Sequence, residues 1–104
     1  MKKLDLRKEA KGRHCTLMLH SDEPHNHDPD TVSLHHIRNR RIFRIGTGQK
    51  PPDIFGCWAC HICHTIVHNP PDDWDADMLE LDELRAMVET QFALHKEGKL
   101  CYTL

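Results

Sequence analysis

Twelve residues concentrate the metal-binding side chains of this chain: Cys57-Trp58-Ala59-Cys60-His61-Ile62-Cys63-His64-Thr65-Ile66-Val67-His68. Thiolates and imidazoles are the ligands that zinc and similar borderline-soft metals prefer. Cys60 and Cys63 have the two-residue gap that lets both sulfurs of a tight turn reach one ion. His64 and His68 are four residues apart, so on a helix they lie on the same face, one turn apart. The stretch therefore predicts a helix start that serves two metal sites.

The length and composition predict one small domain covering residues 1–104. Only 38% of the 104 residues are hydrophobic, so the core is modest and a structural metal would stabilise it. The N-terminus is basic and polar, and no stretch is apolar enough to serve as a signal peptide or to cross a membrane. We therefore expect a cytoplasmic protein whose five cysteines are reduced and bind metal rather than form disulfides.

Charge is distributed unevenly between the two halves of the chain. Residues 1–50 contain eleven Lys and Arg against six Asp and Glu, whereas residues 51–104 contain three against ten. A basic half is compatible with a polyanionic partner, and an acidic half is typical of a solvated helix face.

The segments before the metal-binding stretch predict short strands joined by polar loops. Residues 1–14 read as a basic N-terminal arm, either frayed or in contact with phosphates. Alternation of apolar and polar side chains, with β-branched residues, indicates strands at about 15–20, 31–37 and 54–59. A helix from about 60 to 69 follows and ends at Pro70-Pro71. The loop at 46–53 lacks the glycine and lysine spacing of a nucleotide-binding P-loop.

A second helix is predicted within residues 72–97, capped by Asp72 or Asp73 and ended by Gly98. Apolar residues recur there at steps of three and four residues, at Met78, Leu81, Leu84, Val88, Phe92 and His95. This periodicity predicts an amphipathic helix that buries these residues and exposes an acidic face.

The first candidate metal site is a closed tetrahedral zinc site. Cys60 and Cys63 would supply two ligands, and Cys15 with one histidine from residues 20–27 would supply the others. Cys57 has the same spacing to Cys60 as Cys63 has, so it is an alternative ligand. Inert buried thiols are the competing interpretation, and Cys101 reads as a spare thiol.

The second candidate site is an open one, formed by His35, His36, His64 and His68. Three imidazoles on a divalent ion leave coordination positions for water or a phosphate oxygen, as a catalytic metal requires. The fourth histidine could then take a proton from water. Such a site would suffice to hydrolyse a phosphodiester.

Basic residues follow the histidine pair closely. Arginine in such density suits phosphate binding, although it also suits an exposed strand edge protected by charge. The candidates for nucleic-acid contact are Arg38, Arg40, Arg41, Arg44 and Lys50.

The order of these motifs resembles the HNH endonucleases of the ββα-metal (His-Me finger) superfamily. The histidine pair, the loop with Asp53 and the element Cys60-x-x-Cys63-His64-x-x-x-His68 carry this resemblance. More narrowly, the chain resembles the small prophage-encoded nucleases of the YbcO type. The motifs concerned are Asp5-Leu6-Arg7-Lys8, Gly12-Arg13, His36-Ile37-Arg38, Gly46-Thr47-Gly48, Lys50-Pro51-Pro52-Asp53 and Ala59-Cys60 through Cys63-His64.

The resemblance implies an α+β fold with a ββα-metal core at residues 15–69 and a role for each site residue. His36 would be the general base, His35 with the two helix histidines would hold the catalytic ion, and Asp53 would orient the base. Cys15, Cys60 and Cys63 match structural zinc cysteines. The relatives have a fourth cysteine where this chain has His25, and His20 and His27 are rivals for that position.

The sequence thus predicts an endonuclease that cleaves DNA with Mg²⁺ or Mn²⁺ and carries a structural zinc. RNA is a further candidate substrate, and a homodimer would allow both strands to be cut. The alternative is a zinc-stabilised nucleic-acid-binding module without catalysis. A metal-stabilised protein–protein adaptor is a third interpretation.

Overall fold

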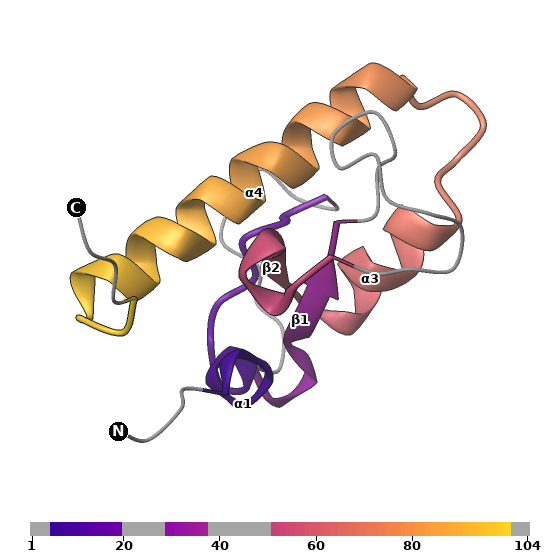
Figure 1. Ribbon diagram of the computed structural model, residues 1–104. Coiled ribbons are helices and arrows are strands. Elements are labelled where there is room, and N and C mark those ends of the chain that lie inside the picture. Colours follow the sequence, from indigo (N-terminus) through magenta and orange to yellow (C-terminus); the bar gives the residue numbers. More distant parts are fainter. Residues whose placement is uncertain (1–4, 20–28, 38–50, 101–104) are drawn as a thin grey trace.

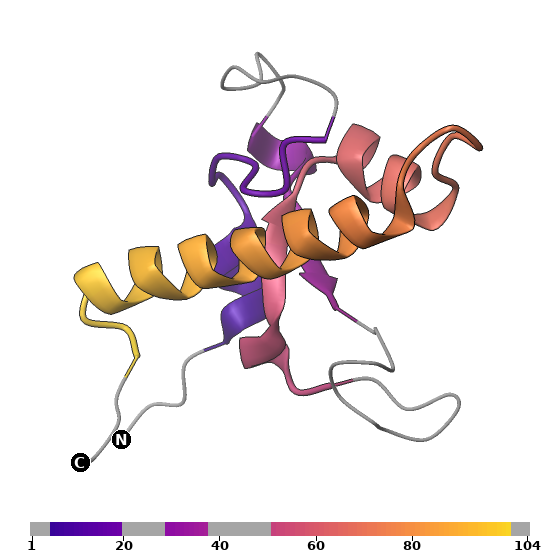
Figure 2. The same ribbon diagram turned by 90° about the horizontal axis from the view of Figure 1, so that it is seen from above.

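A computed structural model describes residues 5–19, 29–37 and 51–100 of the chain. The elements in order are α1 (Leu6–Ala10), η1 (Pro29–Thr31), β1 (Ser33–His36), η2 (Asp53–Phe55), β2 (Gly56–Ala59), α3 (His61–His68) and α4 (Ala76–Lys96). The fold is α+β: α4 runs across β2, α1 lies beside β1, and α3 follows β2 directly (Figures 1 and 2). Within those three ranges, none of the helices has the length and apolarity that crossing a bilayer would require.

The two strands form an antiparallel sheet that is shorter than the sequence predicts. His35 lies opposite Cys57, and His36 lies opposite Gly56. A side chain would not fit at position 56, because a Cβ atom there would lie 2.9 Å from both the His35 carbonyl oxygen and the Leu34 Cδ1. The glycine therefore lets β2 begin directly beside the two histidines. The residues before each strand form the 3₁₀ turns η1 and η2 instead of extending it.

The strand expected at residues 15–20 is absent from its described part, residues 15–19. Instead, the N–H groups of Thr16 and Leu17 both donate to the Trp58 carbonyl, at 2.8 and 3.3 Å. Met18 then adopts a φ of 49°, which turns the chain away from β2. A bend with two donors on one carbonyl cannot continue as a ladder, so this segment forms a turn.

The N-terminal arm also differs from the prediction, because residues 6–10 form α1. Asp5 caps this helix by accepting hydrogen bonds from the Arg7 and Lys8 N–H groups at 3.0 and 3.4 Å. Ala10 is fully buried in the core, and Leu6 packs against that core. A helix cap and a buried face therefore fix the segment that composition alone describes as a frayed arm.

Helix α4 faces the sheet with small and hydroxyl side chains. Its buried residues are Ala86, Thr90 and Leu94. The hydroxyl of Thr90 lies 2.9 Å from that of Thr16, and the Trp58 N–H donates to both, at 3.3 and 3.0 Å. Among the described residues β2 pairs with β1 alone, and the two threonines satisfy this buried N–H. The backbone of β2 and helix α4 can meet this closely only where side chains are small.

The predicted buried face of α4 is wrong for this reason. Met78, Leu81, Val88 and Phe92 are between 54% and 59% exposed. These large side chains point away from the sheet, on the opposite side of the helix from Ala86. The helix boundaries are close to those predicted, with Asp75 as the N-cap in place of Asp72 or Asp73. Gly98 ends the helix with a φ of 71°, as expected.

A group of charged side chains joins the end of α4 to α1. Arg13 donates to Glu9 at 3.0 Å and to both carboxylate oxygens of Glu97. Lys99 reaches Glu9 at 2.6 Å and Glu97 at 3.1 Å. Hydrogen bonds from Arg13 and then from Lys99 lower the pKa of Glu97 to about 2. The Arg13 guanidinium also lies 4.8 Å from the ring centre of Trp58, so this group covers one side of the core.

Candidate metal centres

Three cysteines from separate parts of the chain meet at the start of α3. The sulfurs of Cys15, Cys60 and Cys63 all lie within 4.8 Å of one another, and all three residues are buried. Cys60 is the N-cap of α3, Cys63 lies in its first turn, and Cys15 precedes the turn at Met18. Loop closure between residues 15 and 60 thus brings together the three cysteines that the sequence predicts as ligands.

Backbone N–H groups point at each of the three sulfurs. Met18 N–H donates to Cys15 at 3.4 Å, Leu19 N–H to Cys63 at 3.1 Å, and Cys63 N–H to Cys60 at 3.5 Å. Hydrogen bonds from the Cys63 thiol and from backbone N–H groups lower the pKa of Cys15 to about 4. The pKa of Cys63 is raised because it shares its proton with Cys15, and burial raises it further. Such donors stabilise thiolates, which are the form that binds zinc.

The three sulfur atoms fit a zinc ion that has one further ligand. No fourth Cys, His, Asp or Glu joins the group among residues 5–19, 29–37 and 51–100. The predicted fourth ligand, His25, and its rivals His20 and His27 lie outside the described residues. Cys57 is excluded from the group: it faces His35 across the sheet, and burial followed by the charge of Glu83 raises the pKa of its thiol. Cys101 is also outside the described residues.

Three histidines form a second group one residue further along α3. Ligand atoms of His35, His64 and His68 all lie within 4.8 Å of one another. The ring centres of His64 and His68 are 4.7 Å apart, and that of His35 is 5.2 and 5.8 Å from them. Burial, followed by the charges of His35 and His68, lowers the pKa of His64 and so favours its neutral, metal-binding form. His68 is exposed, so the group is open to solvent on one side.

Glu83 of α4 contacts this group and is a residue that the sequence interpretation missed. One of its carboxylate oxygens lies 3.2 Å from the His35 Nε2, and the two side chains are 14% and 7% exposed. The sequence predicts that the apolar row from Met78 to Phe92 faces the core, and that arrangement would put the acidic residues of α4 in solvent. The available signal was position: Glu83 precedes Ala86 and Thr90 by three and seven residues, which places it on their face.

His36 points to a different partner from its neighbour. Its Nε2 lies 2.6 Å from the Asp53 Oδ1, and its side chain is 9% exposed. Arg7 of α1 approaches the same carboxylate at 3.9 Å. Successive residues of a strand point to opposite faces, so β1 sends His35 toward α3 and α4 and sends His36 toward η2. The structure thereby brings together the two residues predicted as base and orienting group.

Comparison with known proteins supplies the family. The model of the family described as "Putative nuclease YbcO" matches residues 4–99, nearly the whole chain. This chain belongs to the YbcO family. The resemblance to YbcO-type proteins in the sequence motifs is therefore confirmed.

Relatives of the YbcO family match over most of their own length. The protein named "Putative nuclease YbcO" from Escherichia coli (strain K12) is 37% identical over 94 residues, covering 90% of this chain and 94% of that protein. A protein of the same description from Enterobacteria phage 82 matches to the same extent. A solved structure described as a putative bacteriophage protein from Escherichia coli K-12 aligns with a TM-score of 0.66 at 31% identity. That alignment covers 90% of this chain and all of the solved chain.

The basic residues expected to contact nucleic acid cannot be placed in this YbcO-family fold. Arg38, Arg40, Arg41, Arg44 and Lys50 all lie outside the described residues. Their connection in the chain is nonetheless informative. Residues 38–50 join the end of β1 to η2, and His36 and Asp53 lie at those two ends. The described residues that flank this segment, Ile37 and Pro51, therefore lie one and two positions along the chain from His36 and Asp53.

Proposed function

We propose that this chain is a metal-dependent endonuclease of the HNH, or ββα-metal, type that hydrolyses DNA phosphodiester bonds. The observation that carries the proposal is the divergence of two adjacent histidines on β1: His35 joins two helix histidines, and His36 pairs with Asp53. The order β1, β2, α3 agrees with the ββα arrangement implied by the HNH resemblance. The nuclease descriptions of the relatives support the same reaction class.

The proposed general base is His36. When Asp53 accepts the proton on Nε2, the neutral imidazole leaves Nδ1 without a proton. Nδ1 can then take a proton from the water molecule that attacks phosphorus. Asp53 also stabilises the imidazolium that results, in the manner of an acid that orients a catalytic histidine. Because the His36 side chain is nearly buried, its orientation is restricted by packing as well as by this hydrogen bond.

The proposed ligands of the catalytic ion are His35, His64 and His68. Three imidazole nitrogens suit Mn²⁺ better than Mg²⁺, which prefers oxygen ligands. When bound, such an ion supplies positive charge beside the phosphate and the leaving 3′ oxygen. The exposed position of His68 leaves one side of the group accessible to a phosphate. We assign contacts with the DNA backbone to residues 38–50, since this stretch is rich in arginine and joins the two elements that carry His36 and Asp53.

The proposed role of the cysteine group is to hold a structural zinc. Its ligands are Cys15, Cys60 and Cys63, with a histidine of residues 20–27 completing the set, His25 by the family resemblance. The N-cap position of Cys60 and the first-turn position of Cys63 fix the direction in which α3 leaves β2. Since His64 follows Cys63 directly, the orientation of the catalytic histidines depends on this site.

The activity is expected to appear as nicking of supercoiled plasmid DNA. Purified, zinc-loaded protein should nick the plasmid with added Mn²⁺, more slowly with Mg²⁺, and not without an added divalent ion. Gel electrophoresis separates the nicked, linear and supercoiled forms, and DNA ligase should reseal the nicks because the ends carry 5′-phosphates. Salt-sensitive binding to DNA without cleavage under any metal would contradict the proposal and favour a binding module.

Glu83 is expected to act as a positioning residue for the His35 ligand. Carboxylates that contact a metal-binding histidine fix its ring orientation and raise its basicity. We therefore expect Glu83→Gln to weaken Mn²⁺ binding about tenfold, measured by calorimetry on zinc-loaded protein. Glu89→Gln is the matched control, because Glu89 lies on the same helix and pairs with Arg85 instead. Equal Mn²⁺ affinity in the Glu83 variant and the parent would refute this role.

A further inference from the structure

One face of α4 carries large apolar side chains that the domain itself leaves uncovered. Met78, Leu81, Val88 and Phe92 are each more than half exposed, and Trp74 just before the helix is 37% exposed. Single exposed apolar residues are normal on a protein surface, but a continuous row of them along one helix marks an interaction surface. We call these five residues the α4 stripe.

The spacing of the α4 stripe is that of a coiled-coil seam. Trp74, Met78, Leu81, Arg85, Val88, Phe92 and His95 follow one another at alternating steps of four and three residues. This is the repeat that keeps one apolar seam facing a partner helix. The residues that α4 buries against its own domain, such as Ala86 and Thr90, occupy the other positions of the repeat. Helix α4 thus has two faces suited to packing, and only the face with Ala86 and Thr90 packs against its own domain.

We infer that the α4 stripe binds the α4 stripe of a second copy of this chain, with the two helices antiparallel. Charge complementarity between the two ends of the helix favours a second copy as the partner, and it favours antiparallel pairing. The start of the stripe is acidic and exposed, with Asp72, Asp73, Asp75 and Asp77. Its end carries the exposed His95 and Lys96, and the neighbouring Glu97 is already paired with Arg13 and Lys99. A parallel pair would bring the acidic ends together. An antiparallel pair brings each acidic end to the basic end of the other copy, and it opposes the two helix dipoles.

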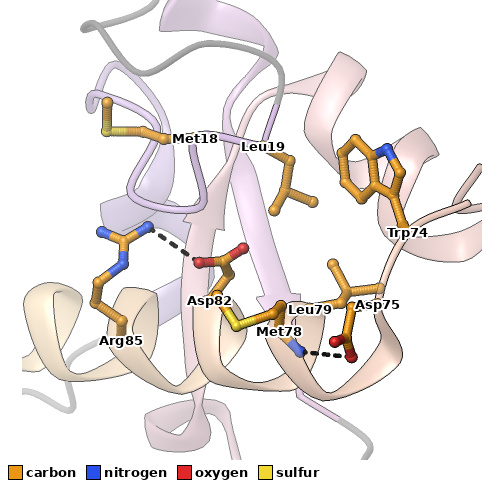
Figure 3. A pocket seen from close by; sticks show the side chains of 8 residues that line it. All are labelled: Met18, Leu19, Trp74, Asp75, Met78, Leu79, Asp82 and Arg85. Carbon is orange, nitrogen blue, oxygen red and sulfur yellow. Dashed lines mark hydrogen bonds and ion pairs between the residues drawn. The ribbon is translucent and has the colours of Figure 1, made fainter.

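The antiparallel arrangement also gives four of the five large side chains an apolar neighbour, and it places Leu81 beside the partner's Arg85. In an antiparallel pair, the first seam residues of one helix lie beside the last seam residues of the other. Phe92 then lies beside the partner's Trp74, and Met78 lies beside the partner's Val88. A pocket borders the stripe at this point, with Trp74, Met78 and Leu79 in its wall (Figure 3). This pocket offers the partner's Phe92 a recess beside its own seam.

The centre of the proposed interface is polar and self-complementary. Arg85 lies at the middle of the stripe and contacts Asp82 at 4.0 Å (Figure 3). It also contacts Glu89 at 2.9 Å. Around a two-fold axis, the guanidinium of each copy can bridge its own acidic groups and those of the other copy. Glu83 lies on the opposite side of α4, toward His35, so this contact leaves the histidine group uncovered.

The test is the mass of the full, zinc-loaded chain in solution, and it does not depend on nuclease activity. Sedimentation should give twice 12.1 kDa at high protein concentration, with dissociation on dilution. The double variant Leu81→Glu/Val88→Glu should remain a monomer at every concentration, with unchanged zinc content and circular dichroism. Ile62→Glu is the matched control, since Ile62 is an exposed apolar residue of α3, 40% exposed, outside the stripe; it should still dimerise.

A crosslinking experiment tests the direction of pairing. In a Cys101→Ser background, a mixture of Met78→Cys and Val88→Cys chains should form a disulfide with a mild oxidant, whereas neither variant alone should. Parallel pairing would instead crosslink each variant with itself and would overturn the antiparallel arrangement. A parent chain of 12.1 kDa at all concentrations would overturn the self-association altogether and assign the stripe to a different partner.

Discussion

Replacing His36 with alanine is expected to reduce DNA cleavage about 10²–10⁴-fold, the usual contribution of a positioned general base. The variant removes the ring that Asp53 contacts at 2.6 Å, and it leaves the cysteine group and the group of His35, His64 and His68 in place. The measurement is the rate of plasmid nicking under single-turnover conditions. Zinc content and thermal unfolding should match those of the parent.

The matched control for this variant is His61→Ala. His61 is the first residue of α3 and lies between Cys60 and Cys63 in the chain, but it is exposed and belongs to neither metal-binding group. We expect its nicking rate to equal that of the parent. If His36→Ala nicks as fast as His61→Ala, His36 is not the base. A loss of activity in both variants would point instead to a general disturbance near α3.

Replacing Cys60 with alanine is expected to unfold the domain. Structural zinc contributes on the order of 10–16 kcal/mol in small zinc domains, which is comparable to or larger than the roughly 5–15 kcal/mol of stability that a folded protein has. Cys60 also caps α3 and lies fully buried beside Cys63. The variant should bind no stoichiometric zinc in this group and show no cooperative thermal transition.

Cys57→Ala provides the control for Cys60→Ala. Both residues are fully buried and lie three positions apart in the same segment, and only Cys60 belongs to the sulfur group. Loss of the Cys57 thiol should cost about 1 kcal/mol, as an ordinary small change in a core does. A cooperative transition and full zinc content in Cys60→Ala would show that zinc bound by the three sulfurs does not stabilise the fold.

The sequence predicted the local parts of this molecule well, because spacing along a helix or turn is a short-range property. The pairs Cys60 with Cys63 and His64 with His68 need only one helix turn to meet, and α3 supplies it. Alternation at residues 31–37 predicted a strand, and because successive residues of a strand point to opposite faces, His35 and His36 contact different elements.

The parts that the sequence did not predict depend on contacts between distant segments. The row of Met78, Leu81, Val88 and Phe92 has the period of a buried helix face, but periodicity does not say whether the same chain or another one covers that face. The hydrogen bond from the Trp58 N–H to Thr90 fixes which face of α4 packs on the sheet, and it joins residues 32 positions apart. Glu83 was missed for the same reason, since its role follows from which side of α4 meets the sheet.

If the proposed zinc and catalytic ion bind as described, the adjacency of Cys63 and His64 would link two metals with different supplies. The sulfur group would take zinc while the chain folds, and the histidine group would exchange its ion freely with the surroundings. In a host cell starved of zinc, newly made chains would lack the ordered α3 that presents His64 and His68, whatever the level of manganese or magnesium. Nutrient zinc would then limit how much active enzyme the cell contains, independently of how strongly the gene is expressed.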